Sequence, residues 1–291
     1  MFVSVREVIL TLIEENIKKI ADELGVEFLE ISAGRDYKAF LPTGKKVNIL
    51  KNKEEFITSW KESGLTIHCI LEFNDFSDDN EKELDYILKG IELAESIGAK
   101  VVRIDPLPTK EKEIEKEKVI ERGVEILDRA LSITRDSYVK LGIENHGIIG
   151  NDPDFLIKVV EQINSPRLGY TLDTGNFYWS GKPLSQVYEI MERLSPRVYH
   201  THVKNIKYPP ELREKKREIG YEYGKYVSPI FEGDIDHRKV AEILKKAGYT
   251  GDFCIEDESL GKYNLPLKKE ILKKDLEYLK SVLRDMERKS V

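Results

Sequence analysis

The chain has 291 residues, of which 40% are hydrophobic and 34% are charged. That length suits one domain of about 250 residues, and a formal net charge of −6 argues against a surface that binds nucleic acid. No apolar segment approaches the ~20 residues that a membrane span requires, and Arg6, Glu7 and Glu14 stand where a signal peptide would be apolar. We therefore expect a protein whose partners are small molecules, with neither membrane nor nucleic acid among them.

The two cysteines bear on the cellular compartment. Cys69 and Cys254 both fall inside predicted buried strands, and two cysteines in so long a chain do not make a disulfide framework. Their number fits a reducing environment. Together with the polar N-terminal segment, they predict a cytoplasmic protein.

Short segments rich in β-branched residues alternate with longer segments of helical period from one end of the chain to the other. In chain order, the predicted strands cover residues 2–5, 26–32, 65–73, 100–106, 141–146, 168–174, 198–204 and 252–256. The segments between them each carry one apolar stripe, as a helix does when it buries a single face. This alternation is typical of parallel βα units. It predicts an α/β protein with a single (β/α)8 barrel, a TIM barrel, over residues 1–291.

The longest irregular segment covers residues 205–236. It contains Tyr208, Tyr221, Tyr223 and Tyr226. So much aromatic surface is unusual in a loop that only faces solvent. Two interpretations are open: a lid over a ligand site, or a contact between the subunits of a homodimer or tetramer. Residues 228–232 within the segment have a weak strand pattern.

Charged residues stand at the carboxyl ends of four predicted strands, where a strand buried on both faces should be apolar. Because side chains alternate along a strand, each charged set shares one face, and the opposite faces carry apolar residues such as Ile143 and Leu172. The charged faces therefore point into the barrel. They carry Glu144 and His146; Asp173; His200, His202 and Lys204; and Glu256 and Glu258. Any one of these residues alone is explained equally well by an ion pair at the barrel mouth.

Four of these residues form a candidate metal site. Asp173 follows Glu144, and His202 follows Asp173, by the same interval of about one βα unit, so the three occupy similar heights on successive strands. Glu256 comes from the last predicted strand. Three carboxylates and one imidazole without a thiolate suit Mn2+ or Mg2+, although Zn2+ or Co2+ can also bind such a set. We predict that Glu144, Asp173, His202 and Glu256 bind one divalent metal ion, with Mn2+ favoured.

Four fragments carry a further signal: GIENHG at 142–147, LDTGN at 172–176, HTHVKN at 200–205 and IEDES at 255–259. Together they resemble the xylose isomerase-like barrel family of sugar phosphate isomerases and epimerases, in order through residues 26–258. The resemblance implies the same four metal ligands. By analogy with the ketose 3-epimerases of that family, it also implies that Glu144 and Glu256 act as acid and base. It places His200 and Lys204 on the substrate side.

Two further strands carry polar residues on their predicted inward faces. Arg103 and Asp105 share one such face, and His68 and Glu72 share the other. These side chains would either bond sugar hydroxyls or form a salt-bridge network at the barrel mouth.

Two more residues are candidates for contact with a substrate. His146 either contacts the substrate or orients Glu144. Trp179, in an aromatic run that begins soon after Asp173, either stacks on a sugar face or packs against a helix. The candidate substrate-binding residues are His200, Lys204, Arg103, His68, His146 and Trp179.

The predicted activity is that of a divalent-metal-dependent sugar isomerase or epimerase, which removes a proton next to a carbonyl and forms a metal-bound enediolate. The main alternative is a lyase on the same scaffold, which would dehydrate an inosose or a dehydroshikimate-type acid or cleave a keto-glycoside after the same first step. An apurinic endonuclease would be expected to have more histidines than the five present, and a non-catalytic sugar-binding barrel to have lost ligands. The chain departs from many relatives in having Asn176 in place of a histidine, and it lacks an arginine shortly after His202. The identity of the sugar therefore stays open.

Overall fold

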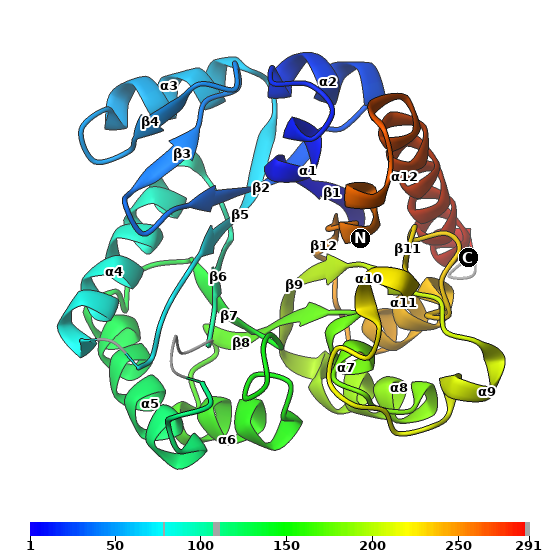
Figure 1. The fold of residues 1–291 in the computed structure, drawn as a ribbon. Coiled ribbons are helices and arrows are strands. Elements are labelled where there is room, and N and C mark those ends of the chain that lie inside the picture. Colours follow the sequence, from blue (N-terminus) through cyan, green and yellow to red (C-terminus); the bar gives the residue numbers. More distant parts are fainter. Residues whose placement is uncertain (78, 107–110, 289–291) are drawn as a thin grey trace.

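Eight parallel strands close into a barrel in the computed structural model, which describes residues 1–77, 79–106 and 111–288. The strand order around the barrel is β1-β12-β9-β8-β7-β6-β5-β2. The barrel strands are β1 (Phe2–Arg6), β2 (Phe28–Ala33), β5 (Thr66–Glu72), β6 (Val101–Ile104), β7 (Lys140–Glu144), β8 (Leu168–Asp173), β9 (Val198–Val203) and β12 (Asp252–Ile255). Figure 1 shows the strands at the centre with the helices arranged around them. The predicted (β/α)8 fold is confirmed, and the strand predicted at residues 2–5 is present as β1.

A helix follows each barrel strand and packs on the outside of the barrel. These helices are α2 (Ile17–Leu24), α3 (Lys53–Glu62), α4 (Asn80–Ile97), α5 (Lys116–Ile133), α6 (Pro153–Ile163), α8 (Leu184–Leu194), α11 (His237–Lys246) and α12 (Leu265–Arg288). Asn16, Asp79, Asp152 and Asp236 each accept a hydrogen bond from a backbone N–H of the helix that they precede. The apolar stripes of the helices meet the outward faces of the strands, and this layer forms the hydrophobic core. Within the described residues, no helix has both the length and the apolar character that a membrane crossing needs.

The shorter elements lie between the barrel strands and these helices. They are α1 (Glu7–Thr11), β3 (Lys38–Phe40), β4 (Lys46–Asn48), α7 (Asn176–Trp179), η1 (Ser195–Arg197), β10 (Asn205–Ile206), α9 (Pro210–Arg213), α10 (Tyr223–Tyr226), β11 (Val227–Ser228) and η2 (Glu258–Lys262). The weak strand pattern at 228–232 corresponds to a shorter strand, because β11 covers only Val227–Ser228. It pairs antiparallel with β10.

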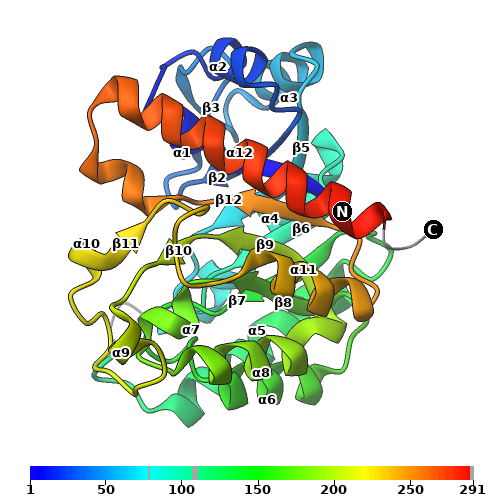
Figure 2. The same cartoon turned by 90° about the vertical axis from the view of Figure 1, so that its right-hand side faces the viewer.

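The Tyr-rich segment 205–236 gathers at one end of the barrel, whereas the N-terminus and the end of α12 lie at the other end (Figure 2). Tyr208 is only 1% exposed, and its ring contacts the rings of Tyr178, Tyr221 and Tyr226. The guanidinium of Arg217 lies 4.3 Å from the centre of the Tyr208 ring. Part of the aromatic surface that the sequence offers for a lid or a subunit contact is therefore used for packing within the chain.

A bulge in β5 changes which side chains of this strand face the barrel interior. Leu29 pairs with Ile67, and the next residue of β2 pairs with Cys69, so His68 is an extra residue in the strand. An extra residue reverses the alternation beyond it. The side chain of Glu72, expected to face inward, therefore faces outward: a Cβ atom on Gly90 of α4 would lie 2.1 Å from Glu72 Oε1. The prediction that Glu72 lines the barrel mouth is wrong for this reason.

We expect Glu72→Gln to raise the free energy of unfolding at neutral and alkaline pH. Burial holds the pKa of Glu72 well above its ordinary value of 4.5, so the folded chain keeps a proton that the unfolded chain releases above about that pH. The contribution of Glu72 to the free energy of unfolding is therefore fully present at acidic pH and decreases as the pH rises. Glutamine does not ionise, so the variant does not undergo this decrease. Chemical unfolding should show a gain of about 1 kcal/mol or more at pH 8 and a smaller one at pH 5.

Glu83→Gln is the matched control for this prediction. Glu83 is also buried, but its carboxylate lies 2.5 Å from the guanidinium of Arg35. Glu83 Oε2 also accepts a hydrogen bond from the backbone N–H of Asp75. Removing the charge of a buried carboxylate that is paired in this way is destabilising, so this variant should lose stability. If Glu72→Gln lost stability at pH 8 in the same way, Glu72 would be ionised in the fold and the prediction would be wrong.

Candidate metal-binding site

The four predicted metal ligands meet at the carboxyl ends of adjacent barrel strands. Glu144 ends β7, Asp173 ends β8, His202 lies near the end of β9, and Glu256 directly follows β12. Each has a potential ligand atom, and these atoms all lie within 4.8 Å of one another. All four side chains are buried. His202 offers Nδ1, which is 3.1 Å from Glu144 Oε1 and 3.4 Å from Glu256 Oε2.

The sequence after Asp173 explains how its carboxylate is oriented. Asp173 Oδ1 accepts hydrogen bonds from the backbone N–H groups of Gly175 and Asn176, at 2.8 and 2.7 Å. This turn leaves Oδ2 facing the cluster. The side chain of Asn176 donates to the backbone oxygen of Asn145 and lies 3.5 Å from Glu144 Oε1.

The chemistry of this cluster fits a divalent cation. Asp173 Oδ2 and Glu256 Oε2 are buried and have no hydrogen-bond partner among the described residues, although Lys204 Nζ lies 3.1 Å from each. Burial raises the pKa of Asp173 to about 7, and the charges of Glu144 and Glu256 add to this against the opposing charge of Lys204. A cation that accepts oxygen ligands would offset this accumulation of negative charge. Three carboxylates with one imidazole match Mg2+ or Mn2+ and are also compatible with Zn2+ or Co2+.

Two arginines hold the outer oxygens of the two glutamates. Arg103 on β6 contacts Glu144 Oε2 through Nε and Nη2, and Arg6 at the end of β1 contacts Glu256 Oε1 through Nη1. Burial alone would raise the pKa of both carboxyls. The pKa of Glu144 is nevertheless held well below its usual value by Arg103 and His202, and that of Glu256 is lowered by Lys204, His202 and Arg6. Both glutamates are therefore ionised carboxylates.

Lys204, a predicted substrate contact, lies inside the cluster. In addition to Asp173 and Glu256, its Nζ contacts Glu258 Oε1 at 2.5 Å. Burial would lower the pKa of Lys204, but these three carboxylates hold it well above its ordinary value. Its ammonium group therefore balances part of the negative charge of the site.

Two other predicted substrate contacts lie at the same end of the barrel as the cluster. The ring of His146 is partly exposed, and its Nδ1 lies 3.2 Å from Asp105 Oδ1, while Arg103 Nη1 lies 3.0 Å from Asp105 Oδ2. His146 is therefore linked to Glu144 through Asp105 and Arg103. Trp179 is partly buried at the end of α7 and packs against the core and against Gly220 of the Tyr-rich segment, so packing within the chain accounts for at least part of its surface.

His200 and His68 do not reach the mouth of the site, in contrast to the expectation from sequence. His200 is fully buried, with Nε2 2.7 Å from Glu30 Oε2 and Nδ1 2.8 Å from Asp252 Oδ1. His68 lies 3.5 Å from the same Asp252 oxygen and lines a cavity of about 730 Å3 beside the first residues of the strands. Alternation correctly predicts that both point inward, but depth along the strand separates them from the cluster at the carboxyl ends.

The sequence analysis missed Arg6 and Glu30. The predicted first strand stopped at Val5, one residue before Arg6. Glu30 is a charged residue in the middle of a predicted buried strand, and the rule that singled out charges on four other strands would have found it. Glu30 lies beneath the cluster, with its Oε1 3.4 Å from Arg6 Nε.

The fold and the cluster define a class of protein: a (β/α)8 barrel with ionisable groups gathered at the carboxyl ends of its strands, where barrels of this kind have their active sites. The chain belongs to the xylose isomerase-like TIM barrel family, whose sequence model matches residues 19–282.

Sequence comparison finds relatives with partial coverage. The chain is 28% identical to an uncharacterized protein of Methanocaldococcus jannaschii over 175 residues, which is 58% of this chain and 54% of that protein. It is 32% identical to an inosose dehydratase of Yersinia enterocolitica over 90 residues, which is 30% of each chain. The match thus spans about half the length of the first relative and less than a third of the second.

Structure comparison finds the same fold over nearly the whole chain. A structure of IolI protein with a bound zinc atom has a TM-score of 0.71 at 18% identity, covering 94% of this chain and 96% of that one. A D-tagatose 3-epimerase-like protein has a TM-score of 0.65 at 22% identity, covering 97% of this chain and 100% of that one. At these identities the likeness shows the shared fold.

Proposed function

We propose that this protein is a divalent-metal-dependent sugar isomerase or epimerase that acts on a small sugar or a sugar-derived ketone. The observation that carries the proposal is the symmetric arrangement of Glu144 and Glu256. Each directs one oxygen toward His202 Nδ1 and has the other held by an arginine. β8 and β9 separate the strands of the two glutamates in the barrel, so the carboxylates approach a substrate from different sides.

Proton transfer is the task of the two glutamates. Because Arg103 and His202 keep Glu144 ionised, and Lys204, His202 and Arg6 keep Glu256 ionised, each carboxylate can accept a proton from a carbon next to a carbonyl. Return of that proton to the neighbouring carbon, with transfer of the hydroxyl proton to the former carbonyl oxygen, moves the carbonyl. Delivery of a proton by the opposite carboxyl group to the other face of the same carbon inverts that carbon. When bound by Glu144, Asp173, His202 and Glu256, a divalent ion supplies the Lewis acid that stabilises negative charge on the substrate oxygen. The oxygen-rich ligand set favours Mn2+ for this role.

A lyase that removes water from a similar substrate is the second candidate. The local similarity to inosose dehydratases favours it. Elimination needs an acid for the departing hydroxyl, and His146 is a partly exposed group of the right kind. Burial would lower the pKa of His146, but its hydrogen bond to Asp105 and the charge of Glu144 raise it above its ordinary value.

Hydrogen exchange in D2O tests the proposal and separates the two candidates. Mn2+-loaded protein would be incubated with ketoses, ketose phosphates, inososes and keto-glycosides, and the products followed by NMR. We expect deuterium at the carbon next to the carbonyl in at least one class of compound, with an isomer or epimer as product. An unsaturated product would favour the lyase, and no exchange with any class by metal-loaded protein would contradict proton abstraction.

A further inference from the structure

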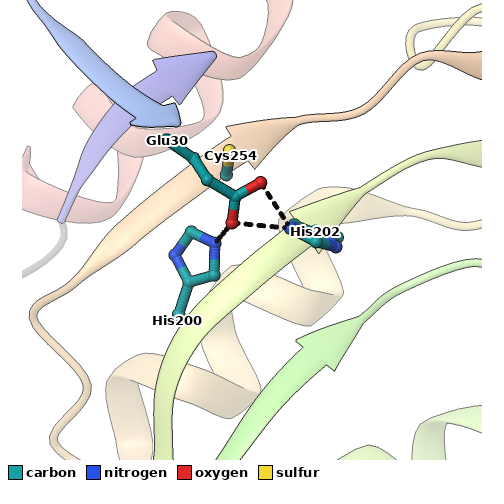
Figure 3. Close-up of side chains that lie close together, drawn as sticks. All are labelled: Glu30, His200, His202 and Cys254. Carbon is teal, nitrogen blue, oxygen red and sulfur yellow. Dashed lines mark hydrogen bonds and ion pairs between the residues drawn. The ribbon is translucent and has the colours of Figure 1, made fainter. Parts of the chain in front are cut away.

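A second buried cluster lies directly beneath the candidate metal site. Glu30 reaches from β2 between His200 and His202 of β9, with Cys254 of β12 beside it (Figure 3). His202 Nε2 lies 3.0 and 2.9 Å from the two oxygens of Glu30, and His200 Nε2 lies 2.7 Å from one of them. All four side chains are fully buried. The cluster shares His202 with the candidate metal site, but the proposed reaction gives no role to Glu30, His200 or Cys254.

We infer that Glu30 is a positioning residue that fixes His202 with Nδ1 as its metal-binding nitrogen, an inference that rests on the proposed function. An imidazole has two nitrogens, and one hydrogen bond decides which of them is free to bind a metal. In His202, Nε2–H donates to Glu30, whereas Nδ1 faces Glu144 and Glu256. Carboxylates that hold the second nitrogen of a ligand histidine set its orientation and its basicity.

Glu30 is itself held in place by further buried contacts. His200 Nε2 and Arg6 Nε both lie against its carboxylate. His200 is anchored in turn by Asp252, which accepts a hydrogen bond from Ser4 Oγ. A carboxylate held from several sides is restricted in its rotamers, so groups outside the four candidate ligands fix the position of His202.

The alternative for this cluster is a second metal site with Cys254 as a thiolate ligand. The nitrogen–oxygen separations of 2.7 to 3.0 Å are those of hydrogen bonds. Atoms that share a tetrahedral zinc ion are about 3.3 to 3.5 Å apart, given metal–ligand distances near 2.0 to 2.2 Å. The geometry therefore points to a hydrogen-bonded support.

Metal binding by the Glu30→Gln variant tests the inference. A glutamine at position 30 has one acceptor oxygen, whereas two imidazole N–H groups, of His200 and His202, need an acceptor. The NH2 group of the glutamine would face one of these N–H groups, and two donors repel each other. We expect calorimetric titration of chelator-treated protein with Mn2+ to show binding weakened about 10- to 100-fold. Glu72→Gln, the same substitution on the adjacent barrel strand but facing outward, is the matched control and should bind Mn2+ like the wild type.

A second measurement needs no variant, so it stands even if Glu30→Gln fails to fold. In histidine-labelled wild-type protein loaded with diamagnetic Zn2+, 15N NMR should show His202 coordinated through Nδ1 and protonated at Nε2. Titration should end at one metal ion per chain.

The outcomes distinguish the inference from the proposed function. The inference would be overturned if Glu30→Gln bound one Mn2+ ion with the affinity of the wild type. It would also be overturned if His202 of the wild type coordinated the metal through Nε2. Either result would leave the proposed function standing. Tight uptake of a second Zn2+ that is lost in Cys254→Ser would also overturn it, because the cluster would then be a metal site. If the wild-type protein bound no divalent ion, the proposed function would fail and the inference with it.

Discussion

Glu144→Gln and Glu256→Gln are each expected to lower turnover about 10³-fold or more while leaving the fold intact. Glutamine has nearly the same shape as glutamate and keeps an oxygen for a metal ion, but it cannot accept a proton from carbon. General acid–base groups commonly contribute 10²- to 10⁴-fold to a rate. The substitution also removes the charge that faces Arg103 or Arg6, which lowers the stability of each variant without unfolding it.

Glu258→Gln is the matched control for both variants. Glu258 contacts Lys204 as Glu256 does, but it is not one of the four candidate ligands. We expect its turnover to fall less than about 10-fold, since its carboxylate supports the site indirectly, through Lys204 and Tyr223. Metal content should be measured for every variant, so that loss of the ion is not mistaken for loss of the base. A variant of Glu144 or Glu256 that turned over at the wild-type rate would remove that residue from the mechanism.

Adding Mn2+ to chelator-treated protein is expected to raise its melting temperature by about 5 to 10 °C. An ion that binds only the native state stabilises it by about 4 kcal/mol at a thousand times its dissociation constant. For a protein of this size, 1 kcal/mol corresponds to roughly 2 °C or somewhat more. The physical source is the buried group of carboxylates, whose mutual repulsion the ion offsets.

Asp173→Asn provides the control for the melting experiment. It removes one ligand charge and, because the pKa of Asp173 is raised to about 7 by burial and its neighbours, it also relieves unfavourable charge in the metal-free protein. The variant should melt at or above the temperature of the metal-free wild type and show no shift with Mn2+. A wild-type protein that showed no shift at saturating Mn2+, Mg2+, Co2+ or Zn2+ would contradict the four-ligand site.

The local sequence was enough to predict the cluster at the carboxyl ends of the strands. Glu144, Asp173 and His202 recur at one interval because each βα unit returns the chain to the same height on the next strand. Alternation along a strand then decides which residues face inward. Both rules act within one strand or one unit, so they can be read without knowing how distant segments pack.

Distances along the barrel axis were less accessible from the sequence. His200 and His202 share one face of β9. His202 is a candidate metal ligand, whereas His200, two residues earlier in the strand, is buried beneath the site. The bulge at His68 has no clear signature in a run of apolar residues, yet it turns Glu72 away from the interior. These errors arise because a one-residue shift in register changes the face of every later side chain.

By itself, the sequence determined the eight βα units, the inward charges and the four residues that form the candidate metal site, since periodicity and spacing are local properties of the chain. Only the tertiary structure decided which partners those residues have. Arg6 and Glu30 come from the first two strands, and Glu256 comes from the last one. They meet because the barrel closes β1 onto β12, a contact between the two ends of the chain that no local pattern specifies.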